Sequence, residues 1–352
     1  MTITRSAPLA AFVAALWFGF QAAPAVAQGA NPSDALALRG AGSTFASLLY
    51  KKWIEAYRKA APTVSISYDP VGSGEGIARF MAETVDFAGS DVPLSEAEIA
   101  NVRNGVAMMP TLAGMIVLAY NVPGLSAELK LPRDVYADIF AGAIKHWDDP
   151  RIRASNPGQN LPHLNIVLVA RLDSSGTTAA FTEHLAAVSP TWRERGLGVG
   201  KLVQWPAGSM LASGSEGVAA RIKISEGAIG YVEYGFPKRL NLPMAVLQNK
   251  AGEFVAPNAA SGQQAMATDA TSLALLPASA VDPTGHGAYP IVTYSWIAFS
   301  RKYADPRKSA ALRDFIDWGL TNGQTAGVDL GYVPLTSGVI ALSKQALGAA
   351  GL

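Results

Sequence analysis

Apolar positions recur along the chain with two periods, one typical of helices and one typical of strands. Residues 45–61 carry apolar side chains at helical spacing, with charged residues between them, and Pro62 follows. This pattern predicts an amphipathic helix that ends before the proline. The stretch Val64–Tyr68 instead alternates apolar and polar side chains, which is typical of a half-buried strand.

The same two patterns predict most of the remaining chain. Strands are expected at 85–88, 116–120, 165–170 and 290–300, and helices at 77–84, 133–140, 177–188 and 309–321. Strands that alternate with helices in this way favour an α/β fold with mainly parallel sheets.

The first 27 residues have the pattern of an export signal. Arg5 supplies a positive charge, residues 7–20 are apolar, and Ala25-Val26-Ala27 offers a small-x-small cleavage site. The apolar stretch is short for the roughly 20 residues that span a bilayer, so a membrane anchor is the weaker interpretation. We therefore predict a cleaved signal peptide at 1–27 and a periplasmic mature protein.

Charge and cysteine content narrow the possible partners and chemistries. The chain has 28 Lys+Arg, 27 Asp+Glu and no cysteine. A balanced charge argues against a nucleic-acid partner, because binding a phosphate backbone needs a clustered excess of cations. The lack of cysteine excludes thiol catalysis and thiolate metal sites, and it also excludes a lipid anchor on an N-terminal cysteine. We expect a soluble protein that is not lipid-anchored.

Three turns share one chemistry, which is that of anion binding. They are Gly40–Phe45, Gly72–Gly76 and Arg171–Thr177, and each places glycine and hydroxyl residues where a predicted helix begins. Free N–H groups and the positive end of the helix dipole favour an anion at such a position. One such turn is ordinarily a plain helix cap. Three of them, one with an arginine, favour a converging oxyanion site.

Two acidic residues accompany these turns. Asp91 follows a short apolar strand, and a role as a turn or capping residue stays open for it. Asp173 lies two residues after Arg171 and can pair with it. Neither residue forms a metal-ligand pattern.

Motifs of common enzymes are missing from the sequence. There is no Gly-x-Ser-x-Gly elbow, no Gly-x4-Gly-Lys-Ser/Thr loop and no His-Glu-x-x-His, and the four histidines are scattered singly. We therefore predict no catalytic residues, no metal and no cofactor.

Several ordered segments of the chain resemble one protein family. They are GAGSTF (40–45), YDPVGSGEG (68–76), VDFAGSDVPLS (85–95), KHWDDPRI (145–152), RLDSSGTT (171–178), GAIGYVEY (227–234) and YPIVTYSWI (289–297). The chain is similar, through these segments, to the periplasmic phosphate-binding proteins of high-affinity phosphate ABC importers. The resemblance covers nearly all of the chain after the predicted signal.

This resemblance implies a two-domain periplasmic-binding-protein fold, the type II venus flytrap, with a ligand cleft between the domains. Domain I is expected to be discontinuous, at 28–120 plus 293–352, and domain II at 121–292. The approximate crossing points are Asn121 and Thr293.

The resemblance also implies a set of phosphate-binding residues. Carried over by position, the ligands are Thr44, Phe45, Ser73, Asp91, Arg171, Ser175, Gly176 and Thr177, with Asp173 orienting Arg171 from behind. Protonated phosphate can donate its O–H to the Asp91 carboxylate. Sulfate has no such proton, and the resulting unpaired contact is enough for roughly 10⁴–10⁵-fold discrimination.

The function implied is that of a non-enzymatic, monomeric receptor that hands inorganic phosphate to ABC permease subunits in the inner membrane. Glu75 departs from the family pattern in a turn that should face the ion, and we expect it to point away from the cleft. If it points inward, the site would be retuned for another protonated oxyanion, such as arsenate or a phosphate ester. A secreted phosphatase with Ser175 or Thr44 as nucleophile is the weaker alternative.

Overall fold

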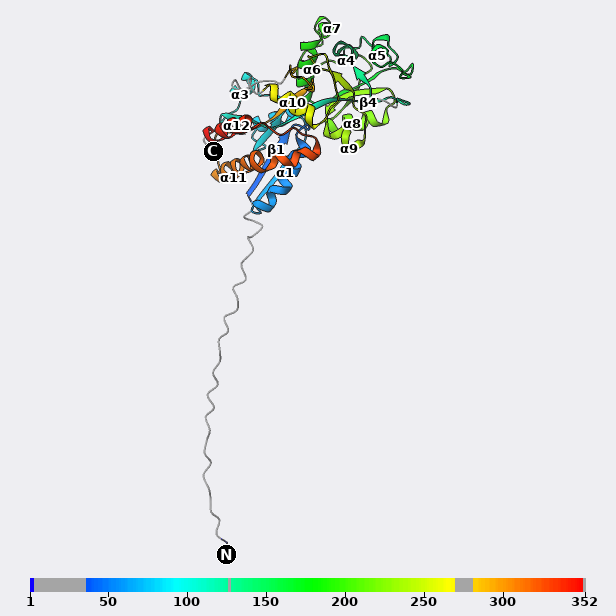
Figure 1. Ribbon diagram of the computed structural model, residues 1–352. Helices are drawn as coiled ribbons and strands as arrows, with labels where there is room; N and C mark the ends of the chain where they lie inside the picture. Colours follow the sequence, from blue (N-terminus) through cyan, green and yellow to red (C-terminus); the bar gives the residue numbers. More distant parts are fainter. Residues whose placement is uncertain (3–35, 126–127, 270–280, 351–352) are drawn as a thin grey trace. The chain divides into compact units, whose positions relative to one another are not determined.

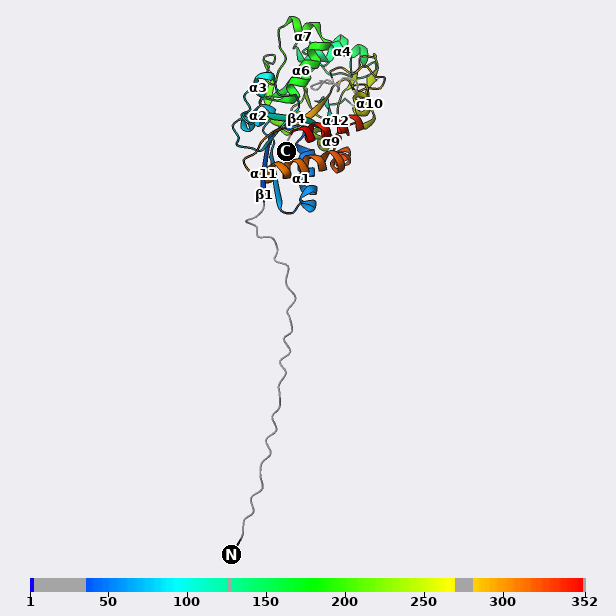
Figure 2. The ribbon, with the colours of Figure 1, turned by 90° about the vertical axis from the view of Figure 1, so that its left-hand side faces the viewer.

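The computed structural model describes residues 1–2, 36–125, 128–269 and 281–350. The predicted signal peptide at 1–27 lies outside them, apart from its first two residues. The described residues from Leu36 onward form one compact unit, whose ribbon is drawn from two directions in Figures 1 and 2.

The fold is a mixed α/β structure built on one large sheet. An eight-stranded sheet runs in the order β2-β1-β3-β11-β4-β8-β6-β7, and a small sheet has the order β10-β9-β5. The strands are β1 (Leu36–Gly42), β2 (Val64–Asp69), β3 (Phe87–Ser90), β4 (Val106–Asn121), β5 (Lys130–Leu131), β6 (Val167–Arg171), β7 (Met210–Ala212), β8 (Ala228–Glu233), β9 (Val246–Gln248), β10 (Phe254–Val255) and β11 (Val292–Ser300).

Helices follow most of the strands. They are α1 (Ser47–Ala60), α2 (Ser73–Met81), α3 (Glu96–Ala100), α4 (Arg133–Phe140), α5 (Pro150–Ser155), α6 (Gly176–Val188), α7 (Pro190–Glu194), α8 (Gly214–Ile224), α9 (Gly235–Leu240), α10 (Ala259–Asp269), α11 (Pro306–Trp318) and α12 (Ser337–Ala349). A π-helical segment, Gly319–Gly323, and a 3₁₀ segment, Gln324–Leu330, lie between α11 and α12. No helix of the described ranges is long and apolar enough to cross a membrane.

The long strand β4 divides the large sheet into two halves. Residues 106–115 of β4 pair with β11, whereas residues 116–121 pair with β8. The first half of the sheet is thus β2, β1, β3, β11 and the start of β4, and the second half is the end of β4 with β8, β6 and β7. Figures 1 and 2 both place α1 and α11 at one end of this unit and α4, α6 and α7 at the other.

The prediction of parallel strands is correct for the outer pairs and wrong for the centre of the sheet. β1 is parallel to β2 and β3, and β6 is parallel to β7 and β8. β11 runs antiparallel to β3 and β4, and β4 runs antiparallel to β8. The reason is that β4 leads out of the first half and β11 returns beside it, so the two must run in opposite directions.

Aromatic rings of both halves belong to one continuous hydrophobic core. In the first half, Trp53 and Tyr57 of α1 pack edge-on against Phe315 of α11. In the second half, Phe181 of α6 stacks on Tyr231 of β8, with ring centroids 4.5 Å apart. These buried rings hold the helices on the sheet. The three glycine-rich turns then lie at the carboxyl ends of β1, β2 and β6, and Asp91 lies at the carboxyl end of β3.

Candidate anion-binding site

Asp91 lies at the centre of the site, directly after β3. Its side chain is buried, and the residue is 2% exposed. The hydroxyls of Ser43 and Ser295 donate to Oδ1, the latter at 3.0 Å, and the Thr177 hydroxyl donates to Oδ2 at 2.9 Å. Ser43 and Ser295 belong to the first half of the sheet, whereas Thr177 begins α6 in the second half. The carboxylate therefore joins the two halves.

The surroundings of Asp91 act on its pKa in opposite directions. Burial raises the pKa of this carboxyl above its ordinary value, and it is the largest effect. The three hydroxyl donors and the positive charge of Arg171 lower the pKa and limit that rise.

Arg171 ends β6 and is 4% exposed. Its Nε donates to Asp173 Oδ1 at 2.8 Å, and Nη2 donates to Asp173 Oδ2. The backbone N–H of Gly214 also donates to Asp173 Oδ1, at 2.9 Å. Asp173 therefore holds the guanidinium from one edge. A guanidinium has five N–H donors in a fixed fork, so the edge not used by Asp173 can bind an oxyanion.

The turns that precede α2 and α6 meet across the site. Ser73 Oγ accepts hydrogen bonds from the backbone N–H groups of Gly176, at 3.1 Å, and Asp91, at 3.4 Å. A Cβ at Gly176 would lie 2.6 Å from Ser73 Oγ, so only glycine allows this close approach. Because Ser73 Oγ accepts two hydrogen bonds, its own proton can be donated to a ligand.

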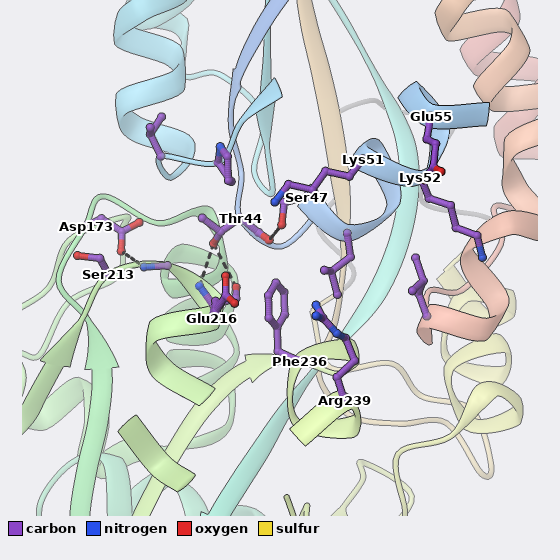
Figure 3. Close-up of a pocket in the computed structure, with 16 residues that line it drawn as sticks. Thr44, Ser47, Lys51, Lys52, Glu55, Asp173, Ser213, Glu216, Phe236 and Arg239 are labelled. Carbon is purple, nitrogen blue, oxygen red and sulfur yellow. Dashed lines mark hydrogen bonds between the residues drawn. The ribbon is translucent and has the colours of Figure 1, made fainter. Parts of the chain in front are cut away.

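Thr44 lies between the buried interior and an open cavity. Its Oγ1 accepts a hydrogen bond from the Ser215 N–H at 3.1 Å and lies 3.1 Å from Ser215 Oγ. A cavity of about 630 Å³ adjoins Thr44 and is lined also by Lys51, Lys52 and Arg239. Figure 3 shows Thr44 and Asp173 on one side of this cavity and Lys52 on the other.

The structure brings all of the predicted ligand residues into one buried region. Ser175 caps α6, because its Oγ accepts from the Thr178 N–H at 3.1 Å. Phe45 is fully buried, and its carbonyl accepts from the Tyr332 hydroxyl at 2.5 Å. The contact of each of these residues with phosphate stays a prediction.

Sequence reasoning missed four hydroxyl residues of this region. Ser43 and Ser295 donate to the Asp91 carboxylate, Thr293 donates to the Asp91 carbonyl at 3.0 Å, and Ser215 bonds Thr44. All but Ser215 lie within segments that carry the family resemblance, so the signal was present but gave these residues no role.

Glu75 points away from the site, as we expected. Its side chain is 53% exposed, and Oε1 accepts from Arg79 Nε at 2.8 Å within α2. Arg79 also pairs with Asp69 at 2.6 Å. The acidic side chain thus lies on the outer face of the helix and adds no negative charge to the interior.

Comparison with known proteins identifies the family. Residues 22–322 match the model of the PBP superfamily domain. The chain is 38% identical to the phosphate-binding protein PstS of Pasteurella multocida over 310 residues, which cover 88% of this chain and 89% of that protein. It is 35% identical to PstS of Methanocaldococcus jannaschii over 342 residues, which cover 88% and 85% of the two chains. The chain belongs to the PstS family.

Solved structures agree on the fold of this PstS-family chain. A high affinity periplasmic phosphate-binding protein, solved with phosphate, superposes with a TM-score of 0.71 at 24% identity, over 88% of this chain and 93% of that one. A phosphate-binding protein from Stenotrophomonas maltophilia gives a TM-score of 0.70 at 21% identity, with the same coverage. At these identities the match concerns the fold alone, which is the two-domain periplasmic-binding-protein fold.

The predicted ligand residues of this PstS-family chain are mainly neutral donors. Arg171 provides the positive charge among them, and one edge of its guanidinium already donates to Asp173. The other donors are hydroxyls and backbone N–H groups after β1 and at the starts of α2 and α6. Such a set stabilises an anion without a basic protein surface, in keeping with the balanced charge of the chain.

Proposed function

We propose that this protein binds inorganic phosphate outside the cytoplasm and delivers it to an ABC permease for import. The proposal rests on membership of the PstS family and on one feature of the interior. Asp91 and Arg171, both nearly inaccessible to solvent, share a site with hydroxyl donors from both halves of the sheet.

The chemistry of Asp91 supports phosphate rather than sulfate. A carboxylate that already accepts three hydroxyls has room for about one further donor, since its two oxygens offer roughly four acceptor positions. Protonated phosphate can supply that donor. Sulfate would instead place a bare oxygen against a buried negative charge.

The ligand set of the proposal is the one expected from the family. Thr44, Ser73, Ser175 and Thr177 supply hydroxyls, Phe45 and Gly176 supply backbone N–H groups, Arg171 supplies the charge, and Asp91 is the acceptor. Of these donors, the Gly176 N–H now bonds Ser73 Oγ, and it would change partner to bind the ion.

Capture requires motion of the two halves of the sheet. Because Asp91 is 2% exposed and Arg171 4% exposed, an ion reaches them only when the cleft opens. We propose two domains, 28–120 plus 293–352 and 121–292, that close by a hinge. The change of partner within β4, between Met115 and Ile116, supports a hinge a few residues before Asn121.

The remaining expectations belong to the same proposal. We propose a monomeric, non-enzymatic receptor in the periplasm, with neither metal nor cofactor. The orientation of Glu75 gives no support to a site retuned for arsenate or a phosphate ester. A phosphatase would need a general base near Ser175 or Thr44. Three histidines form hydrogen bonds with other residues instead: His184 with Tyr136, His163 with Asp148 and His286 with Glu253.

Titration calorimetry of the mature protein with phosphate and with sulfate tests this function. We expect tight binding of phosphate and no measurable heat from sulfate. Equal binding of both anions would contradict the proposed role of Asp91. Turnover of p-nitrophenyl phosphate, with and without divalent metals, would contradict the non-enzymatic role.

A further inference from the structure

An ion pair connects the two halves of the sheet. Lys201 Nζ lies 2.6 Å from Glu98 Oε1, and the two side chains are 20% and 24% exposed. Glu98 belongs to α3, which follows β3 in the first half, whereas Lys201 lies in the segment between α7 and β7 in the second half. Other ion pairs, such as Arg79–Asp69 and Lys308–Asp86, join groups within the first half.

Hydrogen bonds within its own helix turn fix the side chain of Glu98, independently of the ion pair with Lys201. It forms a capping box with Ser95, in which Glu98 Oε2 accepts from the Ser95 N–H at 2.8 Å and from its hydroxyl at 3.0 Å. The other carboxylate oxygen is left for Lys201. Burial raises the pKa of Glu98, but the bonds from Lys201 and Ser95 lower it below its ordinary value, so the carboxylate is charged.

The backbone of Lys201 is anchored directly to the site. Its carbonyl accepts from the N–H of Ser175 at 2.9 Å, and Ser175 is the residue that caps α6. The neighbouring Gly200 N–H donates to Thr182 Oγ1 at 3.2 Å, and Trp205 packs against Tyr231. The lysine side chain therefore extends from a backbone fixed to the same turn that is expected to hold the ion.

We infer that Glu98 and Lys201 form a closure latch, which holds the two halves together after phosphate has bound and slows its release. The inference rests on the proposed function. Surface ion pairs contribute little when two flexible side chains must be ordered. Here one partner is fixed by its capping box and the other by its anchored backbone, so less entropy is lost when they pair. In the open cleft the two side chains separate, so the latch acts on dissociation and not on encounter.

The experiment measures the release of radiolabelled phosphate from the mature protein after a chase with unlabelled phosphate. Glu98→Gln keeps an oxygen for the capping box but removes the charge, and Lys201→Met keeps the aliphatic stem. Each variant is expected to release phosphate about threefold to fivefold faster than wild type. Equilibrium dialysis should show that Kd rises by the same factor as the release rate. The association rate, which is the ratio of the release rate to Kd, is then unchanged. The double variant should be no faster than the single ones, because both remove one interaction.

Two matched variants serve as controls. Glu96→Gln changes an exposed acid on the same helix, and Lys223→Met changes an exposed lysine at the end of α8. Both are expected to release phosphate at the wild-type rate. High salt should quicken release from wild type but not from Lys201→Met.

The outcomes separate the latch from the proposed function. Wild type that binds phosphate, together with Glu98→Gln and Lys201→Met variants that release it at the wild-type rate, would overturn the latch alone. Variants that differ from wild type only in association rate would overturn it as well. Wild type that binds no phosphate would overturn both the function and the latch.

Discussion

Asp91 and Glu233 are two carboxyl groups that are buried to a similar degree. They differ in the hydrogen-bond donors and charges around them. Asp91 accepts three hydroxyl hydrogen bonds and lies near the charge of Arg171. Glu233, at the end of β8, accepts the Gly235 N–H at 2.9 Å through Oε1, and its Oε2 has no hydrogen-bond partner in the described part of the chain. Burial raises the pKa of Glu233 to about 8.

The difference shows that burial alone does not decide the charge of a carboxyl group. Three donors and a nearby cation offset part of the solvation that Asp91 loses, so its pKa rises less than burial alone would raise it. Among the described residues, Glu233 has only backbone N–H groups and the charge of Lys238 to lower its pKa, and the negative charge of Asp91 raises that pKa further. The two carboxyl groups therefore differ in how far their surroundings offset burial, and Glu233, with a pKa of about 8, is mostly protonated at pH 7.

The largest expected effect follows from removing the charge of Asp91. Asp91→Asn should lower the ratio of phosphate to sulfate affinity by about 10²-fold or more, because the amide can donate to sulfate as well as accept from phosphate. Titration calorimetry with both anions measures the ratio. Asp69→Asn, at an exposed acid paired with Arg79, should leave it unchanged. An unchanged ratio in Asp91→Asn would reject the acceptor role.

A somewhat smaller loss of binding is expected when the guanidinium of Arg171 is replaced by an ammonium group. Arg171→Lys keeps the charge but loses the forked bond to Asp173, and the lysine cannot offer a second edge to the ion. Phosphate Kd should rise by about 10-fold to 100-fold, as measured by calorimetry. A Kd within twofold of wild type would mean that the fork does not position the ligand.

Removal of one hydroxyl donor of Asp91 is expected to raise the phosphate Kd by a smaller factor than Arg171→Lys does. Ser295→Ala removes a 3.0 Å bond, which leaves the carboxylate less well compensated, and phosphate Kd should rise by about fivefold. The control is Ser343→Ala, since Ser343 is equally buried but bonds the Pro110 carbonyl instead. Equal loss of affinity in both variants would point to a general loss of stability and not to Asp91.

The smallest effect concerns Glu233 and depends on pH. Its pKa rises from an ordinary value of 4.5 in the unfolded chain to about 8 in the folded protein, so the folded state binds the proton more tightly. The folded state therefore loses stability as pH rises from about 4.5 to about 8. Glu233→Gln cannot ionise, and it should raise Tm by about 2–5 °C at pH 8.5 but hardly at all at pH 4.

Thermal unfolding at both pH values, without phosphate, tests this last prediction. Phosphate affinity of Glu233→Gln should equal that of wild type, because the proposed ligand set does not include Glu233. A Tm difference that is the same at pH 4 and pH 8.5 would show that packing, and not ionisation, separates the two proteins.

Local structure was largely predictable from the sequence. The helix expected at 133–140 is α4, and the strand expected at Val64–Tyr68 is β2 with one more residue. Boundaries failed where glycine-rich segments join a helix: α2 begins at Ser73, four residues before the expected start, so most of the Gly72–Gly76 turn is the first turn of the helix. Small residues give little periodic signal, so the apolar pattern starts later than the helix.

The candidate site was predictable in its local parts but not in its connections. The three glycine-rich turns and Asp91 are visible as segments. The bond from Ser295 to Asp91 joins residues 204 positions apart, and that from Ser43 joins residues 48 positions apart. No pattern of period two or 3.6 contains such pairs, because sheet order decides them.

The sequence by itself determined the periodic elements, the anion-binding turns at helix starts, the lack of thiol chemistry and, by resemblance, the family. Only the tertiary structure decided that the central strands are antiparallel, that Glu75 points outward, that Asp91 receives three hydroxyl donors while Glu233 receives none from the described residues, and that Lys201 contacts Glu98. The physical reason is the distance along the sequence over which each property is decided. Periodicity and capping depend on neighbours within about one helical turn, whereas burial, charge state and contacts between the two halves depend on which distant segments the sheet brings together.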